Sequence, residues 1–299
     1  MIPIGKPRLL VDSKNLVGES PLWHPEEGSL YWTDVNGFTI QRYIFDSGKL
    51  ATWKFGEPVC ALSLTTNPGC VLVALGSRLV LWRPSTDERL DFASPEPRWP
   101  DNRLNDGATD PNGAFWVGSM RNNVGPNGED VEASGNTGSL YRVLPDGRVS
   151  TWDTGFGIAN TVAWSPDRKT FYCGCSVSNT IYAYDFHEAD SSIDNRRIFV
   201  AGIEPGLPDG SAMDEEGYLW NCRFFGGCIL RLNPSGKIDR VIELPVSNIT
   251  NCAFGGPSMN TLFVTTASMH TKKPEAHAGG VFEVSVGIRG LSPDRFRVR

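Results

Sequence analysis

A short pattern recurs along this chain, and the repetition limits the possible folds more than any other feature. Each copy has a polar turn, a strand of small and apolar residues, a tight turn and a second strand rich in aromatic residues, as in residues 104–117 (LNDGATDPNGAFWV) and 207–220 (LPDGSAMDEEGYLW). The six copies begin near positions 18, 59, 104, 159, 208 and 249, about 41 to 55 residues apart. Units of about four strands every 40 to 50 residues are typical of propeller blades. The sequence therefore predicts an all-β fold, a six-bladed β-propeller.

The two ends of the chain are expected to close this ring together. Residues 8–11 (RLLV) predict a short strand that precedes the first repeat. A propeller commonly closes by sharing one blade between the termini, so we expect residues 8–11 to form the outer strand of the last blade. The other strands of that blade then come from residues 250–299. We expect one domain over residues 1–299, since β architectures built from repeats reach this length.

Charge and hydropathy exclude several classes of partner. The chain has 28 basic and 34 acidic residues, a net charge of −6, and no basic stripe, which argues against nucleic acid. Residues 1–16 lack the apolar run of a signal peptide, and the longest apolar run, near residues 71–75, is too short to span a membrane. We therefore expect a cytoplasmic protein without a membrane partner, either a monomer or a weak homo-oligomer.

The seven cysteines predict no metal site. Their number is odd and most lie in apolar strand segments. A structural zinc site would need paired ligands at close spacing, which the chain does not offer. We expect reduced, buried thiols.

Acidic side chains stand at the head of the innermost strand in two repeats. Glu19 precedes the first strand of its repeat, and Asp209 has the same position in the fifth copy. Each residue taken alone is either a solvated turn residue or a site residue. The heads of innermost strands point into the central channel of a propeller, so the repeat symmetry favours a site.

Arg103, Asn105 and Asn160 add polar groups at equivalent positions. Arg103 and Asn105 are two residues apart, so in an extended segment they face the same way. An arginine and an asparagine in one cavity suit an oxygen-rich ligand. In the alternative interpretation, Arg103 pairs with the nearby carboxylate of Asp101 or Asp106. Asn160 offers a neutral oxygen donor, which a hard cation can use.

Residues 121–136 form a long polar insertion rich in Asn and Gly. Loops of this length are often functional. We interpret this loop as a lid over one mouth of the channel.

The motifs, in this order, resemble the SMP-30/gluconolactonase/LRE family, which contains regucalcin and bacterial sugar-lactone lactonases. The resemblance covers nearly all of residues 8–290. It is carried by the following motifs: Gly18-Glu19-Ser20-Pro21 with Trp23, Arg103-Leu104-Asn105-Asp106-Gly107, Trp116-Val117-Gly118-Ser119-Met120, Asn160, Ser165-Pro166-Asp167, Leu207-Pro208-Asp209-Gly210, Glu216-Gly217-Tyr218-Leu219-Trp220 and Phe254-Gly255-Gly256-Pro257.

The resemblance implies a six-bladed propeller with one divalent metal ion in the channel. It implies metal ligation by Glu19, Asn160 and Asp209, and substrate binding by Arg103 and Asn105.

The chain departs from the family pattern at one place. Some members have a substrate-binding glutamate just after Gly-Thr-Met, whereas here Gly118-Ser119-Met120 is followed by Arg121, Asn122 and Asn123. We expect Asn122 or Asn123 to contact the substrate instead.

Two carboxylates and one amide oxygen suit calcium, magnesium or manganese, and zinc also accepts carboxylates. The expected reaction is hydrolysis of a sugar lactone, such as glucono-, arabinono-, xylono- or galactono-lactone, with Asp209 as the base that takes the proton of water. The alternatives are a metal-dependent hydrolase of other esters or phosphotriesters, and a non-enzymatic metal-binding propeller. The polar pocket favours sugars over apolar esters, and the complete ligand set argues against the non-enzymatic alternative.

Overall fold

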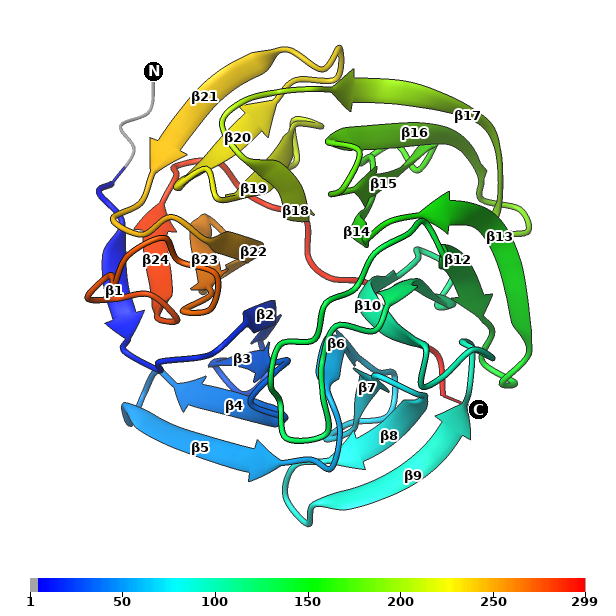
Figure 1. The fold of residues 1–299 in the computed structure, drawn as a ribbon, viewed down its shortest axis with the longest axis horizontal. Coiled ribbons are helices and arrows are strands. Elements are labelled where there is room, and N and C mark those ends of the chain that lie inside the picture. Colours follow the sequence, from blue (N-terminus) through cyan, green and yellow to red (C-terminus); the bar gives the residue numbers. More distant parts are fainter. Residues whose placement is uncertain (1–4, 299) are drawn as a thin grey trace.

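The computed structural model describes residues 5–298, and its strands form six four-stranded antiparallel sheets arranged as blades around a channel (Figure 1). The prediction of a six-bladed propeller is confirmed. In blades one to five the strands follow one another in chain order from the channel outward. No helix within residues 5–298 is long and apolar enough to cross a lipid bilayer.

The strand bounds are as follows. Blade one contains β2 (Gly18–His24), β3 (Ser29–Asp34), β4 (Thr39–Ile44) and β5 (Lys49–Lys54); blade two contains β6 (Val59–Leu64), β7 (Val71–Leu75), β8 (Leu79–Arg83) and β9 (Glu88–Ala93). Blade three contains β10 (Asn102–Thr109), β11 (Phe115–Arg121), β12 (Gly138–Val143) and β13 (Val149–Phe156); blade four contains β14 (Ala159–Trp164), β15 (Thr170–Cys175), β16 (Thr180–His187) and β17 (Ser192–Ala201). Blade five contains β18 (Leu207–Met213), β19 (Leu219–Phe224), β20 (Cys228–Leu232) and β21 (Ile238–Glu243); blade six contains β1 (Arg8–Val11), β22 (Ile249–Gly255), β23 (Thr261–Thr266) and β24 (Val281–Ser285).

Strands from both ends of the chain build blade six, as expected. Its order is β1-β24-β23-β22, so the N-terminal strand is the outermost one. Arg8 pairs with Glu283 and Leu9 with Phe282 in the antiparallel register. The guanidinium of Arg8 also donates a hydrogen bond to the carboxylate of Glu283. The ring is therefore closed by backbone pairing between segments more than 270 residues apart.

The repeated turn between the two inner strands has a physical explanation. In blade three, Asp110 Oδ1 accepts hydrogen bonds from the backbone N–H groups of Asn112 and Ala114, both at 2.9 Å, and Oδ2 accepts one from the indole of Trp116, also at 2.9 Å. One carboxylate thus shapes the turn and satisfies a fully buried indole. Asp214 makes the equivalent contacts with Trp220 in blade five.

The hydrophobic core lies within and between the blades. Trp32, Trp82, Trp116 and Trp220 are completely buried. The outermost strands, such as β5 and β21, alternate exposed and partly buried residues, as expected for sheets that face solvent on one side. All seven cysteines are buried and none forms a disulfide bond.

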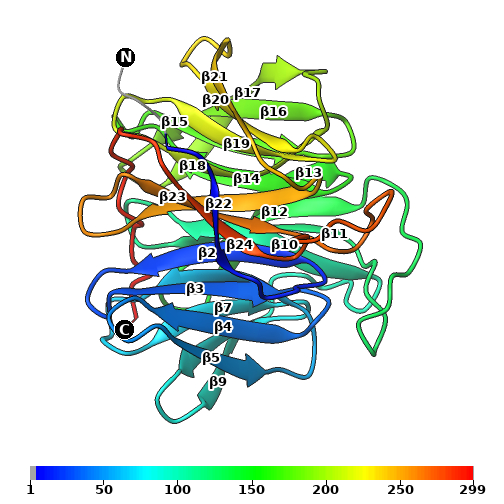
Figure 2. The same cartoon turned by 90° about the vertical axis from the view of Figure 1, so that its left-hand side faces the viewer.

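Two segments cross opposite faces of the ring (Figure 2). The first, here called the lid loop, is residues 122–137 between β11 and β12, and in Figure 1 it extends over the channel toward blade one. Asn36 in blade one donates a hydrogen bond of 2.9 Å to the carbonyl of Gly128, and Asp130 lies 3.6 Å from His270 of blade six. The lid loop, which belongs to blade three, therefore contacts blades one and six.

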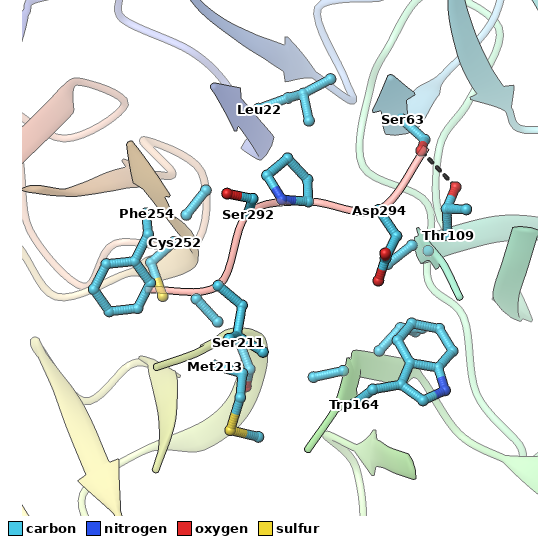
Figure 3. Close-up of a pocket in the computed structure, with 18 of the residues that line it drawn as sticks. Leu22, Ser63, Thr109, Trp164, Ser211, Met213, Cys252, Phe254, Ser292 and Asp294 are labelled. Atoms are coloured by element: carbon cyan, nitrogen blue, oxygen red, sulfur yellow. Dashed lines mark hydrogen bonds between the residues drawn. The ribbon is translucent and has the colours of Figure 1, made fainter. Parts of the chain in front are cut away.

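The second segment, here called the C-terminal strap, is residues 290–298. Its backbone N–H groups donate hydrogen bonds to backbone carbonyls of other blades. Leu291 donates to Met213 of blade five at 3.0 Å, and Phe296 donates to Leu64 of blade two at 2.9 Å. The side chain of Phe296 is completely buried between blades two and three. The strap borders a cavity of about 320 Å³ inside the ring (Figure 3).

Candidate active site

The innermost strand of every blade carries a β-bulge at about the same level. One extra residue stands opposite the neighbouring strand between Glu19 and Leu22 in β2, and between Pro208 and Ser211 in β18. The same irregularity occurs in β6, β10, β14 and β22. Bulges re-aim side chains and are frequent next to active sites. In five of the blades a charged or amide residue stands at the bulge, whereas blade two has Cys60.

Arg103 is the centre of a hydrogen-bond chain at one side of the channel. Its Nε and Nη2 donate to Asn123 Oδ1 at 3.0 and 2.9 Å, and its Nη1 donates to Asn105 Oδ1 at 2.8 Å. Arg103 and Asn105 therefore lie on the same side of β10, as their spacing suggests. Arg103 is 5% exposed and is held by amides, whereas Asp101 lies 4.0 Å from Arg121. Among residues 5–298, Arg103 forms no ion pair with Asp101 or with Asp106, the two partners of the alternative interpretation.

The chain continues from Asn105 to blade four. Asn105 Nδ2 donates to Asn160 Oδ1 at 2.8 Å, and Asn160 Nδ2 donates to Ser176 Oγ at 2.8 Å. Ser176 in turn donates to the carbonyl of Pro208, the residue before Asp209. An amide oxygen has two lone pairs, so Asn160 Oδ1 can accept from Asn105 and still offer one lone pair to a ligand. The structure therefore connects four of the predicted site residues, Asn123, Arg103, Asn105 and Asn160, with the backbone beside a fifth, Asp209.

The two asparagines after Met120 have different surroundings. Asn123 meets Arg103, as described above. Asn122 Nδ2 donates to the carbonyl of Pro100 at 3.1 Å, and its Oδ1 accepts from the backbone N–H of Val124 at 3.1 Å. Both polar ends of Asn122 are therefore used by local backbone, and only Asn123 joins the Arg103 chain.

Three carboxyl groups face one another across the channel. Burial and the negative charge of Asp106 raise the pKa of Glu19 to about 8. Burial, followed by the charges of Glu19 and Asp106, raises the pKa of Asp209 well above its ordinary value. Burial raises the pKa of Asp106 to about 6, although backbone N–H groups of Gly107, Thr161 and Val162 oppose this effect. Burial therefore disfavours the charged forms of these carboxyl groups, and the positive charge of Arg103 offsets this effect only in part for Glu19 and Asp209.

The donor set fits a divalent cation. Within residues 5–298, no three His, Cys, Asp or Glu side chains gather closely enough to bind a metal by themselves. An ion held here would therefore need the amide oxygen of Asn160 beside the carboxylates of Glu19 and Asp209. Such an all-oxygen set is typical of calcium, magnesium and manganese sites. A charge of +2 would also compensate the two carboxylates that burial disfavours.

The structure adds two polar residues to the site, Asp106 and Asn251, that the sequence alone does not identify as functional candidates. In the sequence, Asp106 stands out only as part of a motif and as a possible partner of Arg103. Asn251, at the bulge of β22, donates a hydrogen bond of 2.9 Å to Glu19 Oε2. The signal for Asn251 is its place in the sixth repeat, one residue after the position equivalent to Asp209 in the fifth.

Comparisons with known proteins agree with the fold and the repeats. Residues 17–268 match the family model described as "SMP-30/Gluconolactonase/LRE-like region". Regucalcin of Xenopus laevis is 31% identical over 94% of each chain, and pentonolactonase XacC of Haloferax volcanii is 32% identical over 97% of this chain and 98% of its own. A calcium-binding protein, regucalcin, from Agrobacterium tumefaciens has a similar solved structure, with a TM-score of 0.91, 26% identity and 98% of each chain covered.

The match to the family model covers most of the chain, and the similarity to relatives extends over nearly its full length. The chain therefore belongs to the SMP-30/gluconolactonase/LRE-like family.

Proposed function

We propose that this protein is a carboxylic-ester hydrolase that uses one divalent cation to open a sugar lactone to the aldonic acid. The observation that carries the proposal is the continuous chain Asn123–Arg103–Asn105–Asn160 beside the carboxyl groups of the partly buried Glu19 and the buried Asp209. It offers hydrogen-bonding groups for hydroxyls next to a place for a cation. The relative XacC, named a pentonolactonase, supports a five-carbon aldonolactone as the first substrate to test.

Glu19, Asn160 and Asp209 would hold the cation. When bound, a divalent cation polarises a carbonyl group and lowers the pKa of a nearby water. The oxygen donors favour calcium, magnesium or manganese, and the description of the Agrobacterium relative as calcium-binding makes calcium the first ion to test.

The remaining steps belong to side chains of the protein. Arg103 donates hydrogen bonds to ring hydroxyls and to the carbonyl oxygen as it gains negative charge. Asn105 and Asn123 hold the guanidinium in a fixed orientation. Because Asn123 Oδ1 already accepts two hydrogen bonds from Arg103, the amide NH₂ group of Asn123 is the part that donates to a sugar oxygen. Asp209 takes a proton from the attacking water and returns it to the ring oxygen when the C–O ester bond breaks. One water is consumed and one hydroxy acid is formed.

A pH-indicator assay over a panel of aldonolactones tests this proposal. Hydrolysis of at least one aldonolactone should stop in excess EDTA and return when Ca²⁺, Mg²⁺ or Mn²⁺ is added. Simple apolar esters serve as the control and should be poor substrates, because the site is lined by amides and a guanidinium. Full activity in EDTA, with metal shown to be absent by elemental analysis, would contradict the proposal.

A further inference from the structure

Asn251 lies between two carboxyl groups that come from different blades. It is 6% exposed and stands at the bulge of β22 in blade six. Its Nδ2 donates a hydrogen bond of 2.9 Å to Glu19 Oε2 of blade one, and its side chain lies close enough to Asp106 of blade three to lower the pKa of that carboxyl group. One amide group therefore acts on carboxyl groups from two other blades.

The orientation of this amide is fixed. Its Oδ1 accepts the backbone N–H of Cys252 at 2.8 Å, which directs the NH₂ group toward Glu19. A reversed amide would place its oxygen against the carboxyl oxygens and lose the contact with Cys252. The hydrogen-bond network therefore permits one orientation of Asn251.

Gly210 makes room for Asn251 beside Asp209. A Cβ at position 210 would lie 2.0 to 2.4 Å from the Cγ, Oδ1 and Nδ2 atoms of Asn251, which no real side chain tolerates. The φ angle of Gly210 is outside the left-handed region, so space rather than backbone conformation explains the glycine. The side chain of Asn251 thus occupies the position between Glu19 and the strand of Asp209.

We propose that Asn251 is a positioning residue that holds the carboxylate of Glu19 in the orientation in which Glu19 and Asp209 share one cation. The assignment rests on the proposed function for the cation. A glutamate side chain has several rotatable bonds, and fixing it before the ion arrives removes part of the entropy cost of binding. Partners of metal ligands commonly act in this way, and their removal typically weakens metal binding about 10- to 100-fold.

The first test is the affinity of the ion-free protein for Ca²⁺, measured by titration calorimetry on Asn251→Ala. We expect binding about 10- to 100-fold weaker than in the wild type, with kcat largely restored at saturating Ca²⁺. Asn248→Ala is the matched control, because Asn248 is a fully buried amide of the same blade that donates to the carbonyl of Met269. The control should lose stability but keep its Ca²⁺ affinity.

The outcomes separate this proposal from the proposed function. Wild-type Ca²⁺ affinity in Asn251→Ala would overturn the positioning role, although the lactonase proposal would stand. A wild-type protein that binds none of the divalent cations would overturn both. Equal loss of affinity in Asn251→Ala and Asn248→Ala would show a general effect of destabilising blade six, and would also overturn the positioning role.

A second test needs neither the cation nor activity. In the otherwise wild-type, ion-free protein, Gly210→Ala should clearly lower the denaturation midpoint, because the new Cβ displaces Asn251. In the Asn251→Ala background the same substitution should have little effect, since the clashing amide is gone. Additive losses in the double variant would contradict the placement of Asn251 on which the proposal depends.

Discussion

Glu19 is expected to make the ion-free protein less stable as the pH rises, so Glu19→Gln should stabilise it at pH 8. The pKa of Glu19 is raised from 4.5 to about 8 in the folded protein, first by burial and then by the charge of Asp106. Below pH 4.5 the carboxyl is protonated in both the folded and the unfolded state. Between pH 4.5 and 8 only the unfolded state loses the proton, so the free energy of unfolding falls as the pH rises.

The size of the effect follows from the two pKa values. Each pH unit between them costs about 1.4 kcal/mol, so the difference between 4.5 and about 8 sets an upper limit of about 5 kcal/mol. Glu19 is only partly buried, and water in the channel screens its charge, so we expect about 2 to 4 kcal/mol at pH 8. Glu19→Gln has no titrating group at this position and keeps an oxygen that can accept from Asn251. The variant should therefore lack this part of the pH dependence.

Urea denaturation of the EDTA-treated protein, at intervals from pH 5 to 8, measures the effect. The wild type should lose stability relative to Glu19→Gln across this range, and added Ca²⁺ should stabilise only the wild type. Glu96→Gln is a control in which the pKa shift, and therefore the expected change in stability, has the opposite sign. Burial alone would raise the pKa of Glu96, but hydrogen bonds from Ser119, Arg98 and Asn102 hold it below its usual value, so this variant should be less stable than the wild type. Parallel curves for the wild type and Glu19→Gln would refute the reasoning.

Three further predictions concern other parts of the molecule. Arg103→Ala should raise KM about 10- to 100-fold, because a charged hydrogen bond to the substrate is lost, while calorimetry should show an unchanged Ca²⁺ affinity. Loss of Ca²⁺ binding in this variant would show that Arg103 has a structural role instead. Asp209→Asn should bind the ion more weakly and, when saturated, should still turn over about 100-fold or more slowly; a near-normal rate would exclude the role as base. Phe296→Ala should cost about 3 to 5 kcal/mol in urea denaturation, since the strap's only fully buried aromatic ring is lost; a loss below about 1 kcal/mol would show that the strap is not part of the core.

The sequence was sufficient to predict the ring and the place of its closure. Each repeat of strand and turn residues specifies its own local strand-and-turn structure, and six such repeats in one chain leave few alternatives to a propeller fold. The carboxylate in the repeated turn, as in Asp110 and Asp214, explains why the pattern is so regular: each binds the turn backbone and a buried indole. The alignment of the repeats also placed Glu19 and Asp209 at equivalent strand heads.

The details of the site could not be predicted, because they depend on contacts between blades. The bulges in the innermost strands turn adjacent residues such as Asn105 and Asp106 to different partners, which simple alternation does not describe. Asn251 meets Glu19 across 232 positions of sequence. The C-terminal strap has no repeat signal, and only its contacts with blades two, three and five reveal its role.

The closure of blade six has a consequence for the order of events during synthesis on the ribosome. Glu19, Asn160 and Asp209 have all been made when residue 246 is added, but β22, β23 and β24 of blade six, which lies between blades one and five, are still missing. Nothing then keeps Glu19 near Asp209. A nascent chain of this length therefore contains every proposed ligand and yet has no assembled site, and the cation can stabilise the protein only after the last blade has docked.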